Sequence, residues 1–252
     1  MSPRRTAPRI AAAATAVSAI ALPTCAHATG LSTAAPAHAT AADQAGFVMD
    51  KAQSDRMFPN RDRFSTYDAL VGATSAYPGF AHTGNDALKR REAAAFLANA
   101  SHETGGLRHV VEQNTANYPT YCDTARPYGC PAERAAYYGR GPLQLSSTCK
   151  AAGDALHIDL LHHPDLLQTN PQIAWKSALW YWNTQSGPGS MTAHHAIVTG
   201  AGSGQTIRSI NGAVECDGRN TAEMQDRVNL YQRSAHVLGT SPGTSPGTNL
   251  TC

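Results

Sequence analysis

Apolar positions recur at intervals of three and four residues in several parts of the chain, and this period predicts helices. The longest regular segment is 86–103, with a cap candidate in Asn85 or Asp86 and a stop at the glycine pair 105–106. Its stripe consists of Leu88, Glu92, Ala95, Phe96, Asn99 and Glu103. Glu103 is therefore predicted to lie in the last helical turn, on the apolar face.

The same criteria predict three further helices. The first covers 66–76, and Tyr77-Pro78-Gly79 ends it. The second starts at Asn170-Pro171, a cap followed by a first-turn proline, and runs through Trp182. The third covers 221–238. The chain is thus expected to be mainly helical.

Two segments do not follow a helical period. We expect 107–118 to be extended or a loop, whereas 137–146 is entered through glycines and has the alternation of a short strand. Leu143 and Leu145 would face inward, and Gln144 and Ser146 would face the other way. The predicted fold class is therefore mainly α (α+β), with a small β element.

The last predicted helix carries a charge on its apolar face. Arg227 lies on one stripe with Met224, Val228, Tyr231 and Ala235. A buried guanidinium needs a carboxylate partner, and Glu215 is the nearest candidate in the sequence. The alternative is that Arg227 reaches solvent from the edge of the stripe. Lys176, in the tryptophan-rich helix, has the same two interpretations.

The N-terminus has the features of an export signal. Arg4-Arg5 precedes an apolar, alanine-rich run at 10–22, and Ala26-His27-Ala28 and Ala37-His38-Ala39 are both possible cleavage sites. We therefore assign 1–28 to a secretion signal, with cleavage as late as 39, and 29–45 to a linker. The segment 46–252 is then one catalytic domain. No later run is long and apolar enough to span a bilayer, so the mature protein is expected to be secreted.

Charge and cysteine content limit the functional classes. A net charge of +2 with 15% charged residues gives no reason to expect nucleic acid or anionic lipid as a partner. Of six cysteines, Cys25 lies in the predicted signal region, and an exported chain would use the others for disulfides with one thiol left over. Spacing leaves the pairing open. The pairs His162-His163 and His194-His195 lack the spacing of a metal site.

Two acids suggest a reaction. Carbonyl groups at a helix C-terminus and partial burial both favour a protonated carboxyl at Glu103. Glu112, nine residues further on, lies among polar neighbours where it can stay ionised. One protonated and one ionised carboxyl on separate elements can hydrolyse a glycosidic bond. The alternative is a surface helix that ends in a solvated glutamate.

Three ordered motifs resemble those of glycoside hydrolase family 19, the chitinases. They are Phe96-Leu97-Ala98-Asn99-Ala100-Ser101-His102-Glu103-Thr104-Gly105-Gly106, Tyr137-Tyr138-Gly139-Arg140-Gly141-Pro142-Leu143-Gln144-Leu145-Ser146 and Ile210-Asn211-Gly212-Ala213-Val214-Glu215-Cys216. The resemblance extends from about Phe47 to Cys252 and is strongest to the compact bacterial branch. It implies a two-lobed helical fold similar to lysozymes, with a cleft for β-1,4-linked N-acetylglucosamine.

The resemblance also implies roles for individual residues in an inverting, endo-acting mechanism without cofactor or metal. Glu103 matches the general acid and Glu112 the general base, and Ser146 matches the residue that helps to hold the attacking water. Positions that contact sugar correspond to Gln144, Lys176 and Asn211. Arg227 and Glu215 match a pair that orients the acid, and His102 lies beside it. The disulfides implied are Cys122–Cys130 and Cys216–Cys252, which leaves Cys149 unpaired.

One segment departs from the family pattern. After Ser146 the chain runs through Ser147-Thr148-Cys149-Lys150 directly into Ala151, about two residues shorter than usual and without the asparagine that contacts sugar in relatives. This departure affects one side of the substrate cleft. We expect a secreted, monomeric endo-chitinase. The alternatives are a chitin-binding protein with weak or lost turnover and a relative that cleaves peptidoglycan.

Overall fold

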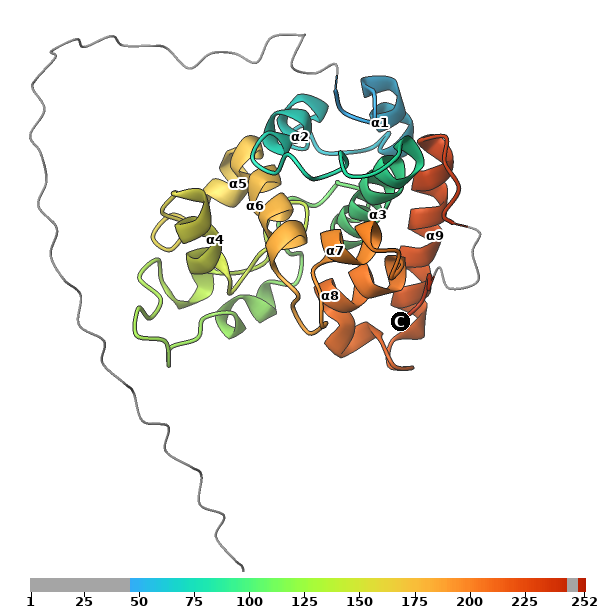
Figure 1. Cartoon of the computed structure of the whole chain (residues 1–252). Helices are drawn as coiled ribbons and strands as arrows, with labels where there is room; N and C mark the ends of the chain where they lie inside the picture. The colour runs from blue at the N-terminus through green and yellow to red at the C-terminus, as the bar shows by residue number, and fades with distance from the viewer. Residues whose placement is uncertain (1–45, 244–248) are drawn as a thin grey trace, which may run out of the picture. The chain divides into compact units, whose positions relative to one another are not determined.

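The computed structural model describes residues 46–243 and 249–252, so the predicted signal and linker lie outside the described residues. Figure 1 shows a mainly helical arrangement in the described part of the chain. The α-helices are α1 (Lys51–Met57), α2 (Tyr67–Thr74), α3 (Asp86–Thr104), α4 (Cys149–Leu156), α5 (Leu166–Thr169), α6 (Pro171–Thr184), α7 (Ala193–Val198), α8 (Ser203–Glu215) and α9 (Thr221–Val237). Two 3₁₀ helices, η1 (Thr115–Thr120) and η2 (Arg134–Ala136), lie between α3 and α4.

The four helices predicted from periodicity are confirmed as α2, α3, α6 and α9. Their caps explain the agreement. The side chains of Thr66, Asn85 and Asn170 each accept a backbone N–H from the first turn of the helix that follows. Helices α1, α4, α5 and α7 have eight residues or fewer and were not predicted, because each spans too few turns for a clear apolar period. Helix α8, of 13 residues, was not predicted either, and a kink at Asn211 interrupts its helical period.

Helix α3 is the centre of the larger hydrophobic core. It packs along α9 and also contacts α7 and α8 (Figure 1). Every residue from Glu92 to Ser101 is buried, so burial extends well beyond the predicted stripe. The ring of Phe96 lies 5.1 Å from that of Phe80 and 5.4 Å from that of Trp182, both edge-on. Glu103 is thus carried on a helix that packs against its neighbours on several sides.

The strand predicted at 137–146 is wrong in its geometry. In the described residues this segment forms only two isolated antiparallel bridges, Val111 with Arg140 and Arg140 with Leu145. Gly141 (φ 72°) and Gln144 (φ 47°) both adopt left-handed backbone conformations and turn the chain back between the bridged residues. Leu143 and Leu145 are buried as expected. The β element therefore consists of two bridges and a tight turn.

A second, smaller core lies on the other side of α6. Leu145, Leu160 and Trp180 belong to this core, whereas Trp175 and Trp182 of the same helix belong to the larger one. Helix α6 is apolar on both of these faces, which explains its three buried tryptophans. The elements that carry the candidate site pack against these two cores.

Both disulfides implied by the family resemblance are present, Cys122–Cys130 and Cys216–Cys252. The second attaches the C-terminal residue to the end of α8. Cys149 is free and buried, and burial raises the pKa of its thiol to about 11. It is therefore a protonated, unreactive thiol at neutral pH.

A buried carboxylate joins α3 to α6 and α7. Glu92 is fully buried, and its Oε1 accepts from Trp182 Nε1 at 3.0 Å and pairs with His194 Nδ1 at 2.6 Å. Its Oε2 accepts the backbone N–H of Ala81 at 2.9 Å. The hydrogen bond to Glu92 raises the pKa of His194, although burial opposes it. The charge on Glu92 is therefore matched by a histidine cation at acidic pH.

This pair predicts a pH-dependent stability. The pKa of His194 in the folded protein is raised above its ordinary value of 6.5. The pair therefore contributes fully to the stability of the fold below about pH 6.5, and this contribution is lost as pH rises through the folded-state pKa. We expect His194→Gln to lower Tm more at about pH 5 than at about pH 9. Thermal unfolding followed by circular dichroism across this range measures the difference.

The exposed neighbour His195 provides the control. His195→Gln should change Tm little, with no trend against pH. A destabilisation by His194→Gln that stays constant or grows with rising pH would contradict the ion pair.

Candidate active site

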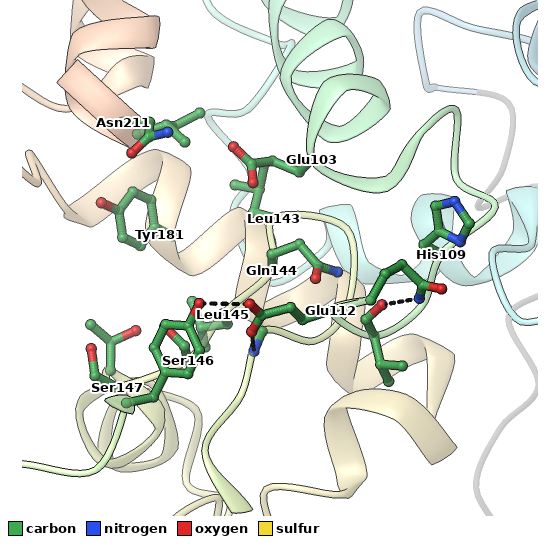
Figure 2. Close-up of a pocket in the computed structure, with 16 residues that line it drawn as sticks. Glu103, His109, Glu112, Leu143, Gln144, Leu145, Ser146, Ser147, Tyr181 and Asn211 are labelled. Atoms are coloured by element: carbon green, nitrogen blue, oxygen red, sulfur yellow. Dashed lines mark hydrogen bonds between the residues drawn. The ribbon is translucent and has the colours of Figure 1, made fainter. Parts of the chain in front are cut away.

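One cavity of about 510 Å³ gathers most of the candidate residues (Figure 2). Its walls come from the end of α3, the loop that follows, the turn before Leu145, and the helices α6 and α8. The candidates that line it are Glu103, Glu112, Gln144, Ser146 and Asn211. Lys176 is half-buried on α6 and does not belong to this lining. The cavity therefore brings together both acids and three of the four predicted water- or sugar-contacting residues.

The backbone after Glu103 turns sharply. Gly105, Gly106 and Leu107 adopt φ values of 58°, 82° and 60°, all in the left-handed region. Thr104 stabilises this turn, because its carbonyl accepts from the N–H groups of Arg108 and His109 and its hydroxyl accepts from Leu107 N. The chain thus reverses at the helix end and returns along the cavity towards Glu112.

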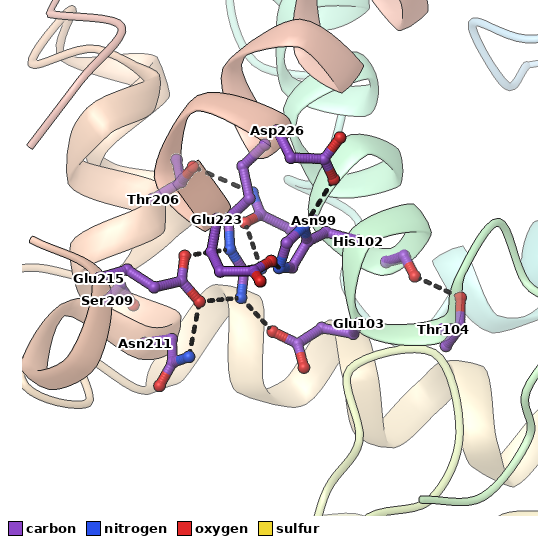
Figure 3. A network of polar contacts seen from close by, with 12 residues as sticks. Asn99, His102, Glu103, Thr104, Thr206, Ser209, Asn211, Glu215, Glu223 and Asp226 are labelled. Atoms are coloured by element: carbon purple, nitrogen blue, oxygen red, sulfur yellow. Dashed lines mark hydrogen bonds and ion pairs between the residues drawn. The ribbon is translucent and has the colours of Figure 1, made fainter. Parts of the chain in front are cut away.

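Arg227 donates hydrogen bonds to three residues at the end of α3 and of α8, among them Glu103. Figure 3 shows Glu103, Glu215 and Asn99 drawn together in this network of polar contacts. Arg227 is 2% exposed, and its Nε and Nη2 donate to the two oxygens of Glu215, each at 2.7 Å. Nη2 also donates to Glu103 Oε1, and Nη1 donates to Asn99 Oδ1 at 3.0 Å. The carboxylate partner predicted from the sequence, Glu215, is thus in place. Asn99 had been identified only as part of the apolar stripe.

The pair of Arg227 and Glu215 stays ionised despite its burial. Burial alone would raise the pKa of Glu215, but the hydrogen bonds and the positive charge of Arg227, together with the hydrogen bond from Asn211, outweigh it and lower that pKa. Burial likewise opposes the charge on Arg227, and Glu103 and Glu215 together raise its pKa. Asn211 donates to Glu215 Oε1 at 2.6 Å from a non-helical kink in α8 (φ −140°, ψ 27°). The kink lets Asn211 line the cavity while it contacts this pair.

His102 contacts a different pair of carboxylates. Its Nδ1 lies 2.8 Å from Asp226 Oδ2 and its Nε2 lies 3.3 Å from Glu223 Oε2, both on α9. The side chain is 12% exposed. His102 therefore connects α3 to α9 beside Glu103, and the structure gives it no direct hydrogen bond to that carboxyl.

Glu112 is held by neutral donors. Asn117 Nδ2 and Tyr121 Oη donate to its Oε1 at 2.8 and 3.0 Å, and its backbone N–H donates to Gly139 O at 2.9 Å. Burial raises the pKa of Tyr121 to about 12, and the hydrogen bond to Glu112 adds to this effect. Tyr121 is therefore a phenol that donates, and Glu112 can accept both bonds as a carboxylate.

Sequence reasoning missed two residues of the cavity lining, Tyr121 and Tyr181, and one donor to Glu112, Asn117. Asn117 and Tyr121 reach Glu112 through the 3₁₀ helix η1, whose irregular backbone has no apolar period to reveal it. Tyr181 of α6 also lines the cavity, and its hydroxyl donates to Ser209 O at 3.0 Å. Burial raises the pKa of Tyr181, and Glu103 contributes to the shift. These three residues add hydrogen-bonding groups to the site.

The shortened segment forms the wall beside Ser146. Ser147 and Thr148 line the cavity there, and α4 begins immediately afterwards at Cys149. The Cys149 thiol donates to Ser146 O at 2.9 Å. This wall of the cavity therefore presents two short hydroxyl side chains.

Neither a metal site nor a membrane-spanning helix is found within the described residues. Among them, no group of three or more His, Cys, Asp or Glu side chains is arranged so that it could hold a metal ion. No helix between residues 46 and 243 has both the length and the hydropathy that a membrane span requires.

Comparison with known sequences and structures gives the same family as the motifs. Residues 47–252 match the chitinase class I family, glycoside hydrolase family 19. The chain belongs to this family. Chitinase C from Streptomyces griseus HUT6037 superposes with a TM-score of 0.79 at 59% identity, over 82% of this chain and 98% of that one. Another bacterial family 19 chitinase superposes with a TM-score of 0.78 at 60% identity, over 82% of this chain and 100% of that one. These likenesses confirm the lysozyme-like fold of the compact bacterial branch.

Plant members are more distant. Endochitinase B of Zea mays is 43% identical over 192 residues, which is 75% of this chain and 63% of the maize protein. The chain thus spans somewhat less than two thirds of that relative, whereas it covers nearly all of the solved bacterial chains.

Removal of Arg227 should destabilise the family 19 fold. Arg227→Ala leaves Glu215 as a buried carboxylate without its cation, and we expect the free energy of unfolding to fall by about 3–5 kcal/mol. The double variant Arg227→Ala/Glu215→Gln removes that charge as well and should regain part of the loss. Urea unfolding of both variants measures the two effects.

Arg208→Ala is the matched control, because Arg208 makes an equivalent two-pronged pair with Asp217 in an exposed position. It should lower stability only slightly. An Arg227→Ala protein no less stable than Arg208→Ala would show that the buried pair is not important to the fold.

Proposed function

We propose that this protein is a secreted, endo-acting chitinase that hydrolyses β-1,4 bonds between N-acetylglucosamine units with inversion at the anomeric carbon. The observation that carries the proposal is the pair Glu103 and Glu112, two carboxyl groups from separate elements that line one cavity in different electrostatic surroundings. Endochitinase B of Zea mays and chitinase C of Streptomyces griseus, named for this activity, support the substrate class.

In the proposal Glu103 is the general acid. Arg227 carries one positive charge, and Glu215 already accepts two of its N–H groups. Arg227 Nη2 also donates to Glu103 Oε1, which fixes the direction of the carboxyl group at the cavity wall. A carboxyl group held in this position can give its proton to the oxygen of the scissile bond.

Glu112 is the general base in the same proposal. It accepts hydrogen bonds from Asn117 and Tyr121 through Oε1 alone, and its Oε2 has only a long contact of 3.5 Å with Gly139 N. One oxygen is thus free to take a proton from water. Ser146, on the wall of the same cavity, would hold that water for attack on the face of the sugar opposite to Glu103.

Two features support secretion. The N-terminal sequence has a basic start, an apolar run and small-residue cleavage sites. The two disulfides fit an oxidising compartment outside the cytosol. The chain is proposed to act as a monomer on chitin or its oligosaccharides, without a cofactor.

Product stereochemistry tests the mechanism. An inverting site keeps its carboxyl groups about 6.5–9.5 Å apart, so that a water fits between base and sugar. We expect chitin hexamer to release reducing ends, and the first product seen by proton NMR to be the α-anomer. An initial β-anomer would contradict inversion, and capture on colloidal chitin without reducing-end release would favour a binding protein.

Substitution of each acid separates the two roles. Glu103→Gln removes the proton donor, so activity on unsubstituted oligomers should fall by about 10³-fold or more. Glu112→Gln should be similarly impaired, but added azide should restore part of its turnover. Azide forms the C–N bond as the glycosidic C–O bond breaks, and the leaving oxygen takes its proton from Glu103, so no base is needed. Azide rescue of Glu103→Gln instead would reverse the assignment.

A further inference from the structure

Three side chains that do not belong to the cavity lining form a stack, and one of them contacts the backbone of Glu112. The rings of Tyr118 and Tyr138 lie nearly parallel, with centroids 3.7 Å apart and an interplanar angle of 13°. The guanidinium carbon of Arg140 lies 3.5 Å from the centroid of Tyr138. A cation against one aromatic face and a second ring against the other form a favourable layered arrangement.

The stack is anchored in the smaller core. Arg140 is 3% exposed, and its Nε donates to Gln168 Oε1 on α5 at 2.8 Å. The hydroxyl of Tyr138 donates to the same oxygen at 3.0 Å. Arg140 Nη1 also donates to Ala136 O at 2.6 Å. Two of the three stacked side chains are thus fixed by a buried, hydrogen-bonded base.

The third member of the stack reaches Glu112. The hydroxyl of Tyr118 donates to the backbone carbonyl of Glu112 at 2.9 Å. Tyr118 lies in η1, and none of the residues of η1 is buried. The segment from Glu112 to Thr120 therefore lacks the apolar burial that fixes α3 and Glu103. Its non-local support comes from the contact between Tyr118 and Tyr138, the hydrogen bond from Glu112 N to Gly139 O, and the hydrogen bond from Arg134 Nε to Pro119 O.

We propose that Tyr118, Tyr138 and Arg140 are positioning residues for Glu112. The stack connects the backbone of Glu112, through Tyr118, to the rigid base formed by Arg140 and Gln168. This inference rests on the proposed role of Glu112 as general base. Without the stack, η1 loses its fixed position, and Asn117 and Tyr121 move with it, so the carboxylate no longer points at the attacking water. A displacement of about 1 Å in a reacting group lowers turnover by about 10²-fold.

Variants of Tyr118 test this inference in the full chain. Tyr118→Leu removes the ring, and kcat on chitin hexamer should fall by about 10- to 100-fold with KM changed by less than about threefold. Tyr118→Phe keeps the ring and loses only the hydroxyl, so its kcat should recover to within about threefold of the unaltered protein. Azide should restore part of the turnover of Tyr118→Leu, since a displaced base is bypassed in the same way as an absent one.

Two further variants provide a control and an independent test of the stack. Tyr128→Leu removes an exposed tyrosine from the Cys122–Cys130 loop and should leave kcat unchanged. Gln168→Leu leaves Tyr118 in place but releases Tyr138 and Arg140, and it should lower kcat in the same direction. It also provides the test if Tyr118→Leu does not fold.

The outcomes separate the two proposals. Equal losses in Tyr118→Leu and Tyr118→Phe would overturn the role of the stack, as would an unchanged kcat in Tyr118→Leu. A loss that azide does not relieve, with a parallel loss of Tm, would show a purely structural role and would also overturn it. Full activity of Glu112→Gln would instead overturn the proposed function of Glu112.

Discussion

The guanidinium of Arg227 connects the three helices on which the candidate acid depends. It projects from α9 and reaches Glu103 and Asn99 on α3 and Glu215 on α8. A buried cation tolerates little displacement of its partners, because each lost hydrogen bond leaves a charge without compensation. The kink at Asn211 and the disulfide at Cys216 both lie within one turn of Glu215. The geometry of the helix end that carries Glu103 is therefore set by an interaction between side chains 124 positions apart.

The two carboxyl groups are supported by different physical means. Glu103 lies at the end of a buried helix and contacts an ion pair, so ionic interactions and close packing fix it. Glu112 lies in a segment with little apolar burial, and neutral hydrogen bonds and an aromatic stack hold it. Arg227 and its partner Glu215 fix the position of the Glu103 carboxyl, whereas Asn117 and Tyr121 hold one oxygen of Glu112 and leave the other with only a long contact. The two carboxyl groups therefore line the same cavity in different surroundings.

Much of the helical framework could be predicted from the sequence, because strong local signals determine it. The caps at Asn85 and Asn170 and the stop at Gly105 act within a few residues, and the structure places them where the pattern does. Thr66, predicted as the first residue of its helix, is the N-cap. The turn at 141–144 could not be predicted, since Gln144 adopts a left-handed conformation that its residue type does not favour. Its two stabilising bonds, from Nε2 to Gly141 O and Val110 O, are defined only in the folded chain.

The residues of the site likewise divide into those that the sequence indicates and those that only the folded chain brings together. The pairing of Arg227 with Glu215 could be inferred, because a cation on an apolar stripe requires a partner and a carboxylate lies nearby in the sequence. The donors to Glu112 could not, since Asn117 and Tyr121 approach it through an irregular turn. The two disulfide pairings came only from the family resemblance. Lys176 was expected to contact sugar, but the structure places it on α6 away from the cavity lining, and its role stays a prediction.

The location of these supports explains why the shortened segment after Ser146 leaves the two acids in place. Glu103 depends on α3, α8 and α9, and Glu112 depends on residues 117–121, Tyr138 and Arg140. Neither set includes Ser147, Thr148 or Cys149. The connection from Ser146 leads directly into α4, and the Cys149 thiol donates to the carbonyl of Ser146 at its start. A difference in the length of this connection would therefore be confined to one wall of the cavity and would leave the supports of both carboxyl groups in place.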